Sequence, residues 1–93
     1  MEQVIESVSK VKGESWGDFR DRWGDPGCAL VMWLARQYTG LTLREIGIAV
    51  GGKDYAAVAM SVRRSHTRLR QNSALHLQAK QACQLLNVKM SPL

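Results

Sequence analysis

The stretch that decides the fold runs from Thr42 to Val58 and is TLREIGIAVGGKDYAAV. Thr42 and Glu45 have the spacing of a capping box, in which each side chain accepts a hydrogen bond from the other residue's backbone N–H. This pair predicts the start of a short helix. The glycine pair at 51–52 predicts its end, because glycine adopts the left-handed backbone that a sharp turn requires.

A longer helix is expected after the glycine turn. Asp54 is a favoured N-cap residue, and the helical pattern after it continues to about Arg70. The expected inner stripe of this helix comprises Val58, Val62 and Leu69. A short helix, a glycine turn and a longer helix with a basic outer side are the outline of a helix-turn-helix.

The sequence before this segment predicts three further helices. The first ends near Gly13, and the third begins with Asp25 as N-cap and Pro26 at the first helical position. The second helix is expected to end at Gly24 and to carry three aromatic side chains, Trp16, Phe19 and Trp23. A last helix is expected after Asn72 or Ser73.

No stretch alternates apolar and polar residues in the manner of a strand. We therefore expect an all-α fold, with five or six short helices around the helix-turn-helix. The 93 residues fit one domain. Within it we expect an N-terminal helical extension (1–24), the helix-turn-helix (42–70) and a C-terminal helix (73–87).

The positive charge lies almost wholly in the second half of the chain. Residues 1–52 carry six Lys or Arg and seven Asp or Glu, whereas residues 53–93 carry seven Lys or Arg and one acid, Asp54. Four of these charges are close together, at Arg63, Arg64, Arg68 and Arg70. Such a cluster is either an ordinary solvated helix face or a surface for a polyanion such as DNA.

Several classes of function are disfavoured. No apolar run approaches the ~18 residues of a membrane span, and the charged N-terminus is unlike a signal peptide, so we expect a cytoplasmic, nucleoid-associated protein. Cys28 and Cys83 are expected to be buried and unpaired, and no spacing of Cys and His suggests a metal site. The segment 47–54 nearly matches a phosphate-binding loop, but it ends in Asp and follows a helix instead of a strand. We therefore expect no cofactor, no small-molecule substrate and no enzymatic activity.

The stretch from Tyr38 to Val58 resembles the DNA-binding C-terminal domain of DnaA, the bacterial replication initiator, which has the pattern L-T-x-x-S-L-x-E-I-G-x-x-F-G-G-R-D-H-[ST]-T-V. It is still more similar to the DnaA-type domain of REP-associated tyrosine transposases. There the patterns L-A-R-x-Y-x-G-L-x-L-R-E-I-G and G-G-x-D-Y-[SA]-A-V recur. That second resemblance covers nearly the whole chain and implies a DnaA-like or Trp-repressor-like helical fold.

Together, the helical spacing and the resemblance predict two groups of DNA-contacting residues. Sequence discrimination is expected from Lys53, Asp54, Tyr55, Ala56, Ala57 and Met60. Phosphate contacts are expected from Arg36, Thr42, Arg44, Arg63, Arg64 and Arg68. The resemblance implies that Asp54 accepts a hydrogen bond from a base amino group. Because alanines replace the initiator's hydroxyl residues at 56 and 57, we expect a different DNA site.

We therefore expect a non-catalytic domain that binds double-stranded DNA sequence-specifically, as the DNA-targeting part of a transposase-related protein. Two alternatives stay open. The two alanines at base-contacting positions fit a helical protein-interaction module that kept the fold and lost DNA binding. A small dimeric repressor also fits, since isolated helix-turn-helix domains often need two half-sites, so a homodimer is an open expectation.

Overall fold

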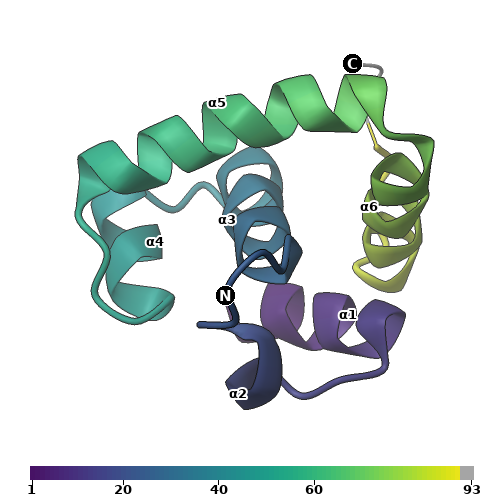
Figure 1. Ribbon diagram of the computed structural model, residues 1–93, viewed down its shortest axis with the longest axis horizontal. Coiled ribbons are helices and arrows are strands. Elements are labelled where there is room, and N and C mark those ends of the chain that lie inside the picture. The colour runs from purple at the N-terminus through teal and green to yellow at the C-terminus, as the bar shows by residue number, and fades with distance from the viewer. Residues whose placement is uncertain (91–93) are drawn as a thin grey trace.

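The computed structural model describes residues 1–90, which form six α-helices and no strand (Figure 1). This confirms the all-α prediction. The helices are α1 (Glu2–Lys12), α2 (Trp16–Phe19), α3 (Gly27–Tyr38), α4 (Leu43–Ala49), α5 (Tyr55–Gln71) and α6 (Ser73–Leu85). Within residues 1–90 no helix has both the length and the apolar character needed to span a membrane.

Helix α3 is the centre of the molecule. In Figure 1, α5 lies across the top and α3 runs beneath its middle, with α4 and α6 under its two ends and α1 at the bottom. Eight of the twelve residues of α3 are buried, and they include Leu30, Val31 and Leu34 as well as Met32, Trp33 and Ala35. A helix enclosed on all sides must be apolar around its circumference, so its buried surface is wider than one stripe.

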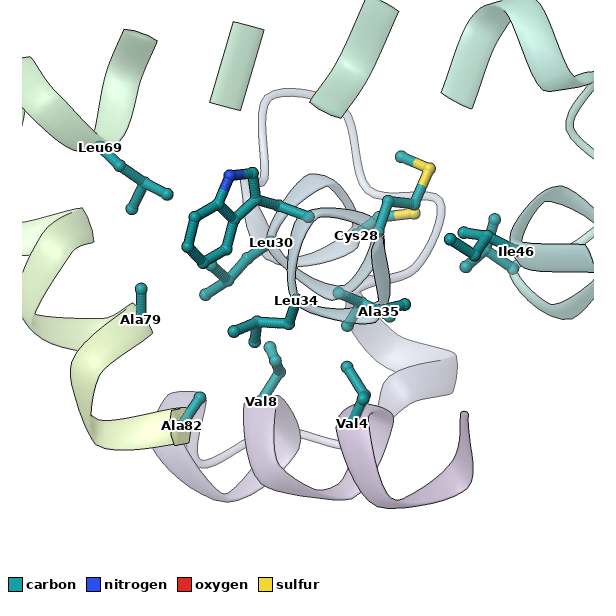
Figure 2. Packing of buried hydrophobic residues seen from close by; sticks show 14 of the residues in the cluster. Val4, Val8, Cys28, Leu30, Leu34, Ala35, Ile46, Leu69, Ala79 and Ala82 are labelled. Atoms are coloured by element: carbon teal, nitrogen blue, oxygen red, sulfur yellow. The ribbon is translucent and has the colours of Figure 1, made fainter. Parts of the chain in front are cut away.

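The core is formed around α3 by side chains from the surrounding helices. Figure 2 shows Leu34 pointing toward Val8 of α1, with Ala82 of α6 nearby. Ile46 of α4 and Leu69 of α5 approach α3 from the other sides. Helix α1 is therefore an integral part of the core, and the helix-turn-helix rests on a platform to which both ends of the chain contribute.

The starts of α4 and α6 are capped by side-chain hydrogen bonds to nearby backbone N–H groups. Thr42 Oγ1 accepts from the backbone N–H of Glu45 at 3.1 Å, and Glu45 Oε1 accepts from the N–H of Thr42 at 3.0 Å, which confirms the capping box. Asn72, not Ser73, caps α6, since its Oδ1 accepts from the N–H of Leu75 at 3.0 Å. Each cap satisfies N–H groups that have no partner within the helix.

The prediction that the second helix continues to Gly24 is wrong. Helix α2 ends at Phe19, whose side chain is fully buried, whereas the side chain of Trp23 is 99% exposed. The chain instead forms a tight turn in which the N–H of Asp25 donates to the carbonyl of Arg22 at 3.2 Å. Gly24 has a φ of 76° in this turn, a left-handed conformation that a continuing helix excludes.

Helix α3 begins at Gly27, one residue later than expected, and its N-cap is Pro26 instead of the expected Asp25. The Asp25 carboxylate accepts from the N–H of Gly27 at 2.7 Å. Cys28 and Cys83 are both buried and unpaired, as expected.

Candidate nucleic-acid interface

The connection between α4 and α5 is a tight turn held by its own backbone. The carbonyl of Gly47 accepts from the N–H groups of both Gly52 and Lys53, each at 2.9 Å. Gly51 and Gly52 have φ values of 112° and 87°, which L side chains rarely adopt. The predicted glycine turn is therefore present, and α5 begins shortly after it, at Tyr55.

Gly47 also permits a close approach of the two chain segments. A Cβ at this position would lie well inside the contact distance of the Lys53 carbonyl oxygen and 3.1 Å from the Lys53 carbonyl carbon. It would also lie 3.4 Å from Cγ2 of Val58. Sequence reasoning missed this role, although a glycine inside a short helix is the signal that could have revealed it.

Asp54 is the N-cap of α5. Its Oδ1 accepts from the N–H of Ala56 at 2.6 Å, and its side chain is exposed. Within residues 1–90, the second oxygen, Oδ2, has no hydrogen-bond partner. One oxygen of this carboxylate therefore stabilises the helix start, while the other is free to accept a hydrogen bond from outside the protein.

The outer face of α5 presents small side chains first and arginines further along. The exposed residues among the candidates are Tyr55, Ala56, Ala57, Met60, Arg63, Arg64 and Arg68. The inner face holds the buried Val58 and Leu69 and the half-buried Val62, as expected. It also holds Ser65, which sequence reasoning missed, although its position seven residues after Val58 completes the same stripe.

The arginines of α5 differ in their electrostatic surroundings from the cations near the N-terminus. In the part of the chain that the structure describes, every ion pair joins residues between Glu6 and Asp25. None of the arginines of α5 has a carboxylate within 4.0 Å in residues 1–90. Their charges are therefore available to an external anion.

The other candidate residues lie at the end of α3 and in the first turn of α4. Arg36, Thr42 and Arg44 are all exposed, and one Arg36 nitrogen, Nη1, lies 3.5 Å from the carbonyl oxygen of Leu41. Thr42 already accepts a hydrogen bond through its hydroxyl in the capping box. Lys53 is exposed in the turn.

Arg20 is a further cation at the turn. A Cβ built on Gly51 would lie 3.7 Å from both Nε and Cζ of Arg20, so the guanidinium packs over the glycine turn. The same guanidinium donates to Asp21 through Nε at 3.0 Å and Nη2 at 2.9 Å. The segment after α2 is thus in contact with the helix-turn-helix.

A network of charges holds that segment in place, and sequence reasoning missed it. Lys12 Nζ lies 2.9 Å from Asp25 Oδ1, and Arg22 Nη1 lies 3.2 Å from Asp25 Oδ2. Arg22 also pairs with Glu14. Burial raises the pKa of Asp25, but the hydrogen bonds from Lys12 and from the Gly27 N–H outweigh burial and hold this pKa below its ordinary value. The pairing depends on the tertiary path of residues 12–25, which local sequence does not specify.

No known protein family, no curated protein and no solved structure matches this chain.

Proposed function

We propose that this chain is a DnaA-like helix-turn-helix domain that binds double-stranded DNA sequence-specifically and performs no catalysis. We further propose that it is the DNA-targeting part of a transposase-related protein and acts in the cytoplasm at the nucleoid. One observation carries the proposal. The arginines on the outer face of α5 have no carboxylate partner in residues 1–90, and they follow a helix start whose exposed residues include two alanines.

The N-terminal end of α5 would enter the major groove. Ala56 and Ala57 allow the helix to approach the bases closely, and their methyl groups can contact a thymine methyl. The free oxygen of Asp54 would accept a hydrogen bond from a cytosine amino group. Tyr55 and Met60 are 57% and 53% exposed and would contact the neighbouring base edges, with Lys53 beside them.

Affinity would come mainly from phosphates. The proposed contacts are Arg36, Thr42, Arg44, Arg63, Arg64 and Arg68, all of which are exposed. If four to six phosphates are neutralised, log Kd should change with log salt with a slope of about 4 to 5 in magnitude. Phosphate contacts orient the protein on the duplex, whereas base contacts select the sequence.

The deciding experiment is a binding-site selection with the purified protein, followed by titration of the selected duplex at several salt concentrations. Arg64→Glu and Arg68→Glu should each weaken binding to all duplexes by similar factors and reduce the salt slope by about 1 or more. Lys10→Glu is the matched control, because Lys10 is an exposed residue of α1 paired only with Glu6. If the control weakens binding as much as Arg64→Glu, or if the slope is near zero, the proposal is wrong.

The helical protein-interaction module is the second candidate function. It is favoured by apolar exposure on the helix-turn-helix, where Ile48 is 70% exposed in addition to Tyr55 and Met60. A salt slope near zero together with capture of a protein partner by this face would support it.

A further inference from the structure

The first observation is a tryptophan displayed to solvent on a constrained turn. Trp23 is 99% exposed, although tryptophan is among the most costly side chains to leave in water. It occupies the second position of the turn closed by the hydrogen bond from the Asp25 N–H to the Arg22 carbonyl, with Gly24 at the third. The turn residues Arg22–Asp25 are called the Trp23 turn below.

Both ends of the Trp23 turn are fixed by ion pairs. Arg22 is bound to Glu14 and to Asp25, and Asp25 is bound to Lys12. The side chain of Asp25 is only 6% exposed, so this anchoring lies below the surface. A side chain on a fixed turn loses little backbone entropy when it is buried by a partner, which is typical of a binding anchor.

The second observation is an apolar hollow of about 410 Å³ beside α6. It is lined by His76, Lys80, Cys83, Gln84, Val88, Lys89 and Met90. The hollow exists because the chain turns back after α6. Asn87 has a φ of 61°, and the N–H of Val88 donates to the carbonyl of Cys83 at 3.0 Å. This hollow, called the α6 hollow below, has more apolar than polar lining surface and includes two lysines in its lining.

The charges around the two surfaces are complementary. Residues 12–26, which carry the Trp23 turn and its partner Lys12, contain four carboxylates and three cations, a net charge of −1. Residues 73–93 contain Lys80 and Lys89 and no acid, a net charge of +2. Neither lysine has an ion-pair partner in residues 1–90.

We propose that two copies of this chain associate by inserting Trp23 of each copy into the α6 hollow of the other. Reciprocal insertion is the contact pattern of a two-fold symmetric dimer, in which each surface meets its complement on the partner. The indole would fill the apolar hollow, while Asp18 and Asp21 would face Lys80 and Lys89. Arg68 of α5 lines a hollow together with Gly24 of the Trp23 turn, but the N-terminal end of α5 belongs to neither surface. The association is therefore tested without DNA.

The test is sedimentation velocity of the whole chain from micromolar to millimolar concentration, together with tryptophan fluorescence. We expect a concentration-dependent dimer. Because Trp33 is already buried and Trp16 is half-buried, the emission shift to shorter wavelength on concentrating the protein should be lost in Trp23→Phe. Trp23→Ala should weaken the dimer about 30-fold or more, the usual loss for truncation of an anchoring tryptophan.

Variants of the hollow separate this dimer from other associations. Lys80→Glu should weaken the dimer several-fold, and adding Asp21→Lys should restore much of the loss by exchanging the charges. Leu77→Ala is the matched control, because Leu77 is an exposed residue of α6 that does not line the α6 hollow. Circular dichroism of each variant verifies that the helices are intact.

Three results would overturn the proposal. The first is a protein that stays monomeric at millimolar concentration. The second is a dimer that Trp23→Ala dissociates while Lys80→Glu does not affect it, because the hollow would then not be the receptor. The third is a Trp23 emission that changes only when duplex DNA is added, which would assign Trp23 to the DNA interface.

Discussion

Replacing Gly47 with alanine tests the geometry of the turn that precedes α5. The new Cβ would overlap the carbonyl oxygen of Lys53 and lie 3.1 Å from its carbonyl carbon. The obstacle is backbone, and it cannot rotate away as a flexible side chain would. The two hydrogen bonds from Gly52 and Lys53 to the Gly47 carbonyl, each 2.9 Å long, hold the segments at this separation.

The expected cost is the sum of opposing effects. Alanine is favoured over glycine inside a helix by about 1 kcal/mol. Overpacking costs about 1–3 kcal/mol, and weakening the two turn hydrogen bonds costs about 0.5–1.5 kcal/mol each. We therefore expect Gly47→Ala to lower the free energy of unfolding by roughly 1–5 kcal/mol. In a domain of this size that lowers Tm by roughly 5–40 °C.

Urea and thermal denaturation followed by circular dichroism measure this effect. Gly17→Ala in α2 is the matched control, because a Cβ there meets no atom within 4 Å and its φ is not positive. The control should unfold at or slightly above the wild-type temperature. If Gly47→Ala is as stable as the wild type, the close approach between Gly47 and the Lys53 carbonyl is not as described. That approach would then not be what positions the start of α5.

Three further predictions concern single side chains. Asp54→Ser should keep the helix cap and leave Tm near the wild-type value. The same substitution should reduce the difference in affinity between the best DNA site and a DNA site changed at one cytosine. An unchanged difference in affinity together with a lower Tm would show that Asp54 acts only as a helix cap. Because the pKa of Asp25 is lowered below its ordinary value of 3.8, its pairing stabilises the fold above about pH 4, and this contribution is lost as the pH falls through the lowered pKa. Asp25→Asn removes the charge facing Lys12 and should therefore be less stable than the wild type at pH 7. Denaturation curves should show a smaller difference in stability between the two proteins at pH 2.5 than at pH 7. A difference in stability that does not change with pH would contradict the role given to the Asp25 ion pair. The side chain of Ser65 is 4% exposed and makes no hydrogen bond within residues 1–90. Because alanine has the higher helix propensity, Ser65→Ala should raise the free energy of unfolding, measured by urea denaturation, by about 0.5 kcal/mol. A loss of stability would instead reveal a hydrogen-bond partner for the Ser65 hydroxyl.

The local chemistry of the chain was sufficient to predict the starts of α4, α5 and α6 and the helix-turn-helix outline. Thr42 with Glu45, Asp54 and Asn72 each bond to backbone within three residues, so their roles are visible in sequence. The glycines at 51 and 52 end α4 for an equally local reason, their positive φ. The 3.6-residue period of a helix is likewise enough to place most of the candidate residues of α5 on its outer face.

The tertiary structure decided the features that the 3.6-residue period of a helix does not determine. A helix of one turn has too few residues for its period to be informative, so Phe19 and Trp23 look alike in sequence, yet one is fully buried and the other fully exposed. Whether the N-terminal cations are paired depends on the path of residues 12–25 around the end of α1, because Lys12 and Asp25 meet only through that path. The proximity of Gly47 to Lys53, the α6 hollow and the unpaired state of the α5 arginines likewise depend on how separate segments pack. Sequence therefore determined the elements, through bonds that close within a turn, whereas packing between elements decided which side chains are buried, paired or left free to bind.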